Sequence, residues 1–163
     1  MKIGVTGHRQ LFDDSWVKEA ITASLSEVPS SCMGISSLAI GADQLFAEIV
    51  LHQGGTLHVV LPFEDYERTF DAGASRDRYF ELLRCATSVE TLSARENDEE
   101  SYLAAGQHIV DLADRMIAVW DGEKAAGLGG TGDIVQYARA ARKEVLHIDP
   151  VLRKVRVLPK KGP

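Results

Sequence analysis

The residues best suited to chemistry form a glycine-rich segment, residues 127–133 (Gly-Leu-Gly-Gly-Thr-Gly-Asp), between the apolar run 116–120 and an amphipathic segment that begins at Ile134. Glycine reaches positive φ values and lets a ligand approach the backbone, and the first N–H groups of a following helix have no partner within that helix. The segment therefore predicts a binding site for a phosphate or carboxylate group. The alternative is a tight turn that the glycines only make possible.

Short apolar runs alternate with segments of helical periodicity along the chain. We expect strands at residues 3–6, 37–40, 57–61, 89–92, 116–120 and 144–148, and helices at 17–28, 42–50, 79–86, 102–113 and 134–141. Strands that are apolar throughout and alternate with helices are typical of a parallel sheet covered on both faces. We therefore predict a three-layer α/β fold with a mainly parallel sheet flanked by helices.

Composition narrows the class of protein. The chain has 163 residues, 45% of them hydrophobic, which predicts one domain at residues 1–150 followed by a C-terminal tail at 151–163. The formal charge is −6, and the sequence has no basic run longer than a pair such as Lys160-Lys161, so nucleic acid is not an expected partner. No segment resembles a secretory signal or a membrane span, and Cys32 and Cys85 are far apart in the sequence. We expect a cytoplasmic protein without a zinc site or disulfide.

The ligand crevice of a parallel sheet lies outside the carboxyl ends of its strands. The candidate binding residues after the predicted strands are Gly7, His8, Arg9, Gly41, Ala42, Asp43, Pro62, Phe63, Asp121, Gly122, Gly129, Gly130 and Thr131. Arg9 is suited to hold a phosphate with two hydrogen bonds, and Gly7 would allow the close approach. The alternative for His8 and Arg9 is a solvated turn.

Three aspartates at these turns have two interpretations each. Asp43 is able to accept hydrogen bonds from a ribose, but an aspartate at the start of a helix also caps it. Asp133 stands in the first turn of the predicted last helix and has the same alternative. Asp121 ends a strand, where a turn role competes with ligand binding.

The segment 63–84 is the candidate for a cover over the site, because it mixes charged and aromatic residues. Tyr66 or Phe70 would stack on a base, and Arg76 or Arg78 would reach a phosphate. The alternative is a solvated loop whose aromatic residues belong to the core. The histidines at positions 52, 58, 108 and 147 lack the paired spacing of a metal site, so no metal ligands are predicted.

Three blocks of sequence resemble the SLOG superfamily, which joins the DNA-processing protein A (Smf) proteins with the Lonely Guy phosphoribohydrolases. The blocks are residues 4–9, residues 37–43 with Ala47, and residues 127–131. The second is similar to the Gly-Ile-Asp segment of the DNA-processing branch, and the third to the nucleotide loop of the Lonely Guy branch. The resemblance implies a modified Rossmann fold, a nucleotide-like ligand and a homodimer, with some members acting as sensors and others hydrolysing an N-glycosidic bond.

One departure from the family pattern concerns catalysis. The Lonely Guy motif has its catalytic glutamate three residues after the threonine, and that position is Ile134 here. Asp133 is adjacent, but neighbouring positions of a helix point about 100° apart. We therefore expect a sensor or carrier domain that binds a nucleotide of the NAD, ADP-ribose or nucleoside phosphate class. No cofactor is required, although Mg²⁺ would accompany a nucleotide.

Two other functions stay open. The first is hydrolysis of an N-glycosidic bond, with a carboxylate among Glu64, Asp121 and Asp133 stabilising the positive charge that develops on the sugar. Asp133 and Glu64 are the first choices for this role. The second is a module that only binds a partner protein, against which the glycine-rich segment argues.

Overall fold

Strands and helices alternate along the chain in the computed structural model, which describes residues 1–125 and 127–160. The elements are β1 (Lys2–Gly7), α1 (Asp14–Ser26), β2 (Met33–Ser36), α2 (Ala42–His52), β3 (Thr56–Leu61), the 3₁₀ helix η1 (Tyr66–Thr69), α3 (Ala74–Cys85), β4 (Ser88–Thr91), α4 (Asp98–Leu112), β5 (Arg115–Val119), α5 (Thr131–Ala140), β6 (Glu144–Asp149) and β7 (Lys154–Leu158). The alternation confirms the predicted α/β fold.

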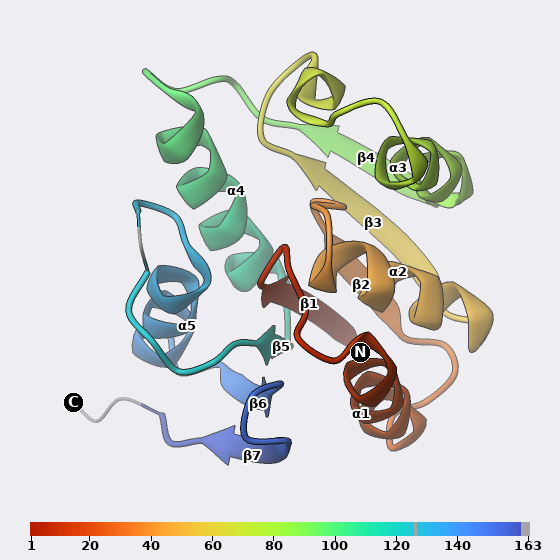
Figure 1. Cartoon of the computed structure of the whole chain (residues 1–163), viewed down its shortest axis with the longest axis vertical. Coiled ribbons are helices and arrows are strands. Elements are labelled where there is room, and N and C mark those ends of the chain that lie inside the picture. Colours follow the sequence, from red (N-terminus) through yellow and green to blue (C-terminus); the bar gives the residue numbers. More distant parts are fainter. Residues whose placement is uncertain (126, 161–163) are drawn as a thin grey trace.

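The seven strands form one sheet in the order β4-β3-β2-β1-β5-β6-β7 (Figure 1). Every neighbouring pair is parallel except β6 and β7, which are antiparallel. From β1 the chain first extends the sheet toward β4 and then returns to the other side of β1 with β5. The strand order therefore reverses between β1 and β5, and ligand crevices of open α/β sheets lie at such a point.

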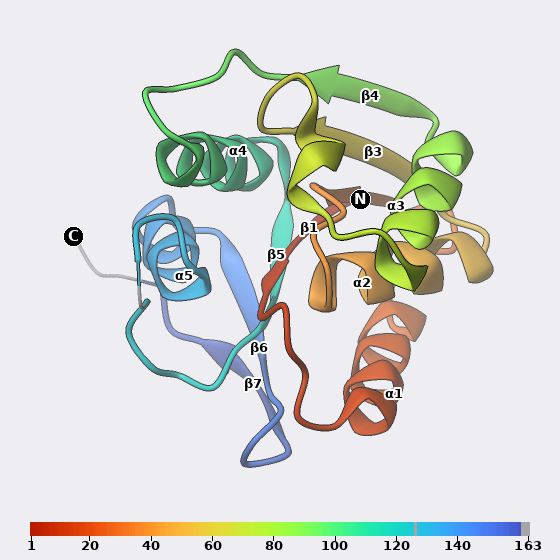
Figure 2. The same ribbon diagram turned by 45° about the horizontal axis from the view of Figure 1, so that its top comes forward.

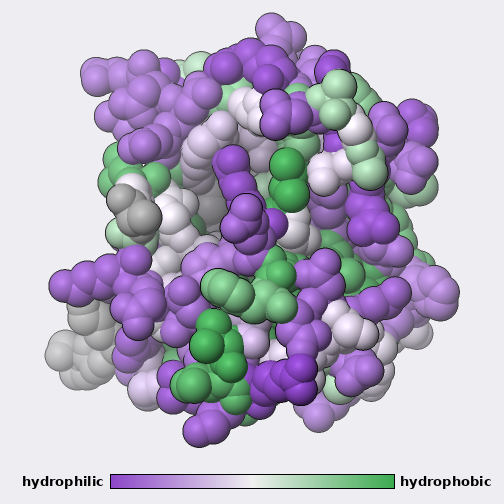
Figure 3. Space-filling model, in the orientation of Figure 1, coloured by the Kyte–Doolittle hydropathy of each residue, from purple (hydrophilic) through white to green (hydrophobic). Residues whose placement is uncertain are grey.

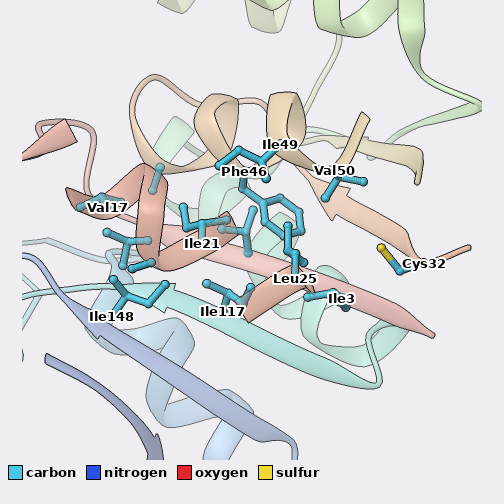
Figure 4. Packing of buried hydrophobic residues seen from close by; sticks show 14 residues of the cluster. Ile3, Val17, Ile21, Leu25, Cys32, Phe46, Ile49, Val50, Ile117 and Ile148 are labelled. Atoms are coloured by element: carbon cyan, nitrogen blue, oxygen red, sulfur yellow. The ribbon is translucent and has the colours of Figure 1, made fainter. Parts of the chain in front are cut away.

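Helices cover both faces of the sheet. Figure 2 shows α1, α2 and α3 on one side, and α4 and α5 on the other. Val17, Ile21 and Leu25 of α1 recur at a spacing of four residues and pack with Phe46 of α2 against the sheet (Figure 4). A second cluster joins α4 and α5 to the opposite face. The three layers leave the carboxyl ends of the strands uncovered by helices.

Two segments differ from the prediction. The apolar run 37–40, expected as a strand, is a turn after β2, and Leu38 is fully buried there with φ of +57°. Its apolar character reflects burial under the turn rather than membership of the sheet. Residues 154–158 of the expected tail form β7, because their backbone pairs with β6 from Val145–Leu158 to Asp149–Lys154. Among the described residues, no helix combines the length and apolar character that a membrane span needs.

Candidate functional site

A cleft of about 550 Å³ opens at the point where the strand order reverses. Most of its lining comes from three parts of the chain: residues of the turns after β1 and β2 (residues 6–9 and 36–43, the N-terminal wall), residues of the segments 120–125 and 127–132 (the glycine-rich loop) and one face of α4. Figure 3 shows this face of the molecule hollowed between the regions that Figure 1 labels α4, α5 and β1. The cleft therefore lies where the parallel sheet predicts a ligand.

The N-terminal wall is held by backbone contacts. The N–H of His8 donates to the Val119 carbonyl at 3.0 Å, and the N–H of Ala42 donates to the His8 carbonyl at 3.1 Å. Gly41 has φ of +90°, and a Cβ at this position would lie 2.4 Å from the Arg9 carbonyl oxygen. Gly41 and Ala42 do not line the cleft; they carry the turn that presents Arg9, because the two turns touch there.

Asp43 lines the cleft from a buried position in the first turn of α2. Its Oδ2 accepts hydrogen bonds from the Ser36 hydroxyl at 3.0 Å and from the Ser37 N–H at 3.2 Å. Burial raises the pKa of this carboxyl to about 6, although these hydrogen bonds and the charge of Arg9 favour the ionised form. Asp43 is therefore a carboxyl group able to change protonation state near neutral pH.

Arg9 and Tyr102 face each other across the cleft. The guanidinium carbon lies 5.6 Å from the centre of the Tyr102 ring, within the range of a cation–π contact. The aromatic residues expected to stack on a base lie elsewhere, since Tyr66 is 3% and Phe70 is 6% exposed in a core cluster. Tyr66 still lines the cleft, whereas Phe70 does not.

A contact between His8 and Asp121 joins the N-terminal wall to the glycine-rich loop. The His8 Nε2 atom lies 3.2 Å from Asp121 Oδ1 and 3.2 Å from the Asp121 backbone nitrogen. Asp121 Oδ1 also accepts from the Glu123 N–H at 3.0 Å. That bond and the nearby His8 lower the pKa of Asp121, so its carboxylate is ionised at neutral pH.

Some backbone N–H groups of the glycine-rich loop form hydrogen bonds within the loop or to Asp133. The N–H of Gly129 donates to Asp133 Oδ2 at 3.0 Å, and Gly129 has φ of +79° beside the α4 backbone. The N–H of Gly130 points to the Gly127 carbonyl at 3.4 Å. Within the described residues, the N–H groups of Thr131 and Gly132 at the start of α5 and the Thr131 hydroxyl have no hydrogen-bond partner, which makes them candidate donors to a ligand.

Several predicted site residues lie outside the cleft. Glu64 lines a separate groove with Arg68 and Asp98, and Phe63 is buried in the core beneath α3. Gly122 and Asp133 flank the cleft without lining it, and the carboxylate of Asp133 holds the loop instead. Neither carboxylate chosen for catalysis therefore reaches the cleft, because one side chain points to another groove and the other satisfies a backbone N–H.

The two arginines of the expected cover also lie away from the cleft. Arg78 pairs with Glu48 at 3.2 Å and lines a neighbouring groove, and Arg76 lies 5.8 Å from the ring centre of Phe80. The aromatic residues of the segment 63–84 pack into the core, as in the alternative interpretation of this segment as a solvated loop with aromatic residues in the core. The cleft is lined instead by α4 and the glycine-rich loop.

The remaining predicted residues come together in the cleft: Gly7, His8, Arg9, Asp43, Pro62, Asp121, Gly129, Gly130 and Thr131. Sequence reasoning missed Glu99 and Tyr102 on α4, and Trp120 at the end of β5. The indole Nε1 of Trp120 donates to the Glu123 carbonyl at 2.8 Å, which fixes its ring at the cleft. Within residues 1–125 and 127–160, no group of three His, Cys, Asp or Glu side chains is placed to hold a metal ion.

Comparison with solved structures finds two related folds. DNA processing protein A (DprA) from Streptococcus pneumoniae superposes with a TM-score of 0.60 at 17% identity, over 90% of this chain and 49% of DprA. TM1055, a structural genomics target, superposes with a TM-score of 0.54 at 17% identity, over 88% of this chain and 71% of TM1055. The chain has the same Rossmann-like α/β fold as DprA and TM1055.

The likeness concerns the fold alone, since both identities are 17% and this chain spans about half of the length of DprA. Comparison of the sequence finds no matching family model and no matching curated protein. The likeness confirms the Rossmann-like architecture expected from the resemblance. The chemistry of the cleft must be argued from its own residues.

Proposed function

We propose that the cleft binds a nucleotide or a nucleotide-derived small molecule, and that the protein acts as a sensor or carrier domain. The observation that carries the proposal is the convergence of Arg9, two aromatic rings and the N-terminus of α5 in one cleft at the reversal of strand order. The fold shared with DprA and TM1055 is consistent with a nucleotide-related Rossmann-like domain. Arg9 and the α5 N-terminus suit a phosphate, and Tyr102 and Trp120 suit a base.

The charges of the cleft favour a ligand with few phosphates. Its lining contains the carboxyl groups of Asp43, Glu99, Asp121 and Glu123 but few cationic groups, chiefly Arg9 and Lys124. A polyanion such as nucleic acid needs many neutralised phosphates for affinity. Carboxylates accept hydrogen bonds from ribose hydroxyls, which makes a small nucleotide the better match.

Calorimetric titration of AMP and adenosine into the wild type and the Arg9→Gln variant tests the proposal. The wild type is expected to bind AMP, and Arg9→Gln to bind it about tenfold more weakly or worse, because an ionic hydrogen bond to phosphate is lost. Adenosine affinity should stay unchanged. Arg84→Gln, at an exposed position of α3 outside the cleft, removes the same charge and is the matched control.

An equal loss of AMP affinity in Arg9→Gln and Arg84→Gln, or no binding of any nucleotide by the wild type, would refute the proposal. Titrations in EDTA and in Mg²⁺ show whether the ion accompanies the nucleotide.

Gly130→Val adds a test of the glycine-rich loop. It should abolish AMP binding without unfolding the domain, because the added Cβ would lie 2.7 Å from the Ala125 Cβ and displace the loop that lines the cleft.

N-glycosidic hydrolysis is the second candidate function, and one observation favours it. Asp43 and Asp121 line the same cleft, burial raises the pKa of Asp43 to about 6, and hydrogen bonding lowers the pKa of Asp121. A carboxyl with a raised pKa and one that stays ionised are the pair that acid-assisted glycoside cleavage uses. Chromatography of the titrated mixtures decides: released base that disappears in Asp121→Asn supports a hydrolase, and intact ligand supports a sensor.

A further inference from the structure

A second groove lies beside the cleft and shares Arg9 with it. It has a volume of about 690 Å³ and runs between residues 9–12, the start of α2 and the start of α3. Its walls include Phe12, Ser75 and Arg78. Since both volumes fall in the range of small-molecule sites, the two compartments offer room for a ligand of two parts.

The floor of the groove is built by a buried side chain. Gln44 is 3% exposed, and its Nε2 donates to the Leu38 carbonyl at 3.2 Å and to the Ser75 carbonyl at 3.0 Å. These bonds join the turn after β2 to the first turn of α3. The groove is therefore a fixed feature of the fold and does not depend on the placement of surface side chains.

The groove offers an aromatic face and a cation. Phe12 is 74% exposed, although a large apolar side chain gains free energy by burial. Arg78 of α3 also lines the groove and forms an ion pair with Glu48 at 3.2 Å. An exposed phenyl ring beside a polar groove suits a flat heteroaromatic ring, which stacks on it whatever its hydrogen-bonding groups.

We propose that the ligand has two nucleoside units joined by phosphates, one in the cleft and the other in the groove. This inference rests on the proposed function of the cleft. Arg9 lines both compartments, and its guanidinium group presents several donors in one plane, which suits phosphates that pass between them. The second base stacks on Phe12, and Arg78 lies beside its sugar. A mononucleotide fills only the cleft.

Titration of AMP and NAD into four forms of the protein tests the inference: wild type, Ala74→Trp, Ala72→Trp and Phe12→Ser. Ala74 is exposed and lines the groove, so a tryptophan there obstructs it. Ala72 is exposed two residues earlier and does not line the groove, which makes its tryptophan variant the matched control. Both changes, and Phe12→Ser, lie on the surface, where substitutions seldom disturb folding.

The wild type is expected to bind NAD at least tenfold more tightly than AMP. Ala74→Trp and Phe12→Ser should weaken NAD binding about tenfold and leave AMP binding unchanged, whereas Ala72→Trp should change neither. Equal affinity for AMP and NAD in the wild type, or equal effects of the two tryptophan variants, would overturn the inference and leave the proposed function standing. Absence of binding by both compounds would overturn the proposed function and this inference with it.

Discussion

Two turns of the molecule contain the same residue types and use them differently. Gly41 in the N-terminal wall has φ of +90°, and an added Cβ would lie 2.4 Å from the Arg9 carbonyl oxygen. Gly122 in the glycine-rich loop has φ of +88°, but its added Cβ would meet none of the described atoms within 4 Å. The two φ angles are nearly equal, but an added side chain meets backbone atoms only at Gly41. The N-terminal wall belongs to the folded frame, whereas this part of the loop faces solvent.

The aspartates at the starts of α2 and α5, Asp43 and Asp133, also differ in burial and in their hydrogen-bond partners. Asp43 is buried and accepts from Ser36 and Ser37, while Asp133 is half-buried and accepts from the Gly129 N–H. Each stands in the first turn of a helix, at α2 and α5 respectively. Only the first reaches the cleft. An aspartate in the first turn of a helix therefore serves the site in α2 and the loop in α5.

The largest expected difference in the free energy of unfolding is between the variants Gly41→Ala and Gly122→Ala. Both place alanine at positive φ, which costs about 1–2 kcal/mol. Gly41→Ala adds a backbone clash and should lower the free energy of unfolding by a further ~1–3 kcal/mol. Urea denaturation of the three proteins measures both changes. Equal destabilisation by the two variants would show that packing does not distinguish the turns.

The next effect is a pH dependence of stability caused by Asp43. Burial raises the pKa of this carboxyl from the ordinary 3.8 to about 6, so the folded protein holds the proton more tightly than the unfolded chain. This contribution to stability is present below about pH 4 and is lost as the pH rises through about 6. Between pH 4 and pH 7, wild type should lose about 2 kcal/mol relative to Asp43→Asn. Urea midpoints across this range test the difference, and parallel pH profiles would contradict it.

The smallest effect is expected from Asp133→Asn. Asparagine keeps an oxygen that accepts the Gly129 N–H, so AMP affinity should stay within about twofold and stability within about 0.5 kcal/mol. Asp133→Ala removes the acceptor and should cost about 1 kcal/mol. Calorimetry and urea denaturation measure the two quantities. A tenfold loss of affinity in Asp133→Asn with unchanged stability would assign this carboxylate a direct role in the cleft.

Part of the site could be predicted because parallel strands end at one edge of the sheet. His8, Arg9, Asp43 and Asp121 follow three strands that are far apart in sequence, and the fold brings all four to the same cleft. Strand topology is sufficient for that conclusion. Glu64 also follows a strand, β3, but its side chain lies in another groove. The position of a residue after a strand therefore predicts the edge of the sheet at which it lies, but it does not predict the direction of its side chain.

The sequence by itself determined the layers of the fold, because apolar periodicities of strands and helices are local properties of the chain. Only the tertiary structure decided that Tyr102 of α4 faces Arg9 and that residues 154–158 add a strand to β6. The rotation of a helix and the pairing of an edge strand depend on neighbours distant in sequence. For the same reason, the sequence does not predict that Gly41 is tightly packed and that Gly122 is not.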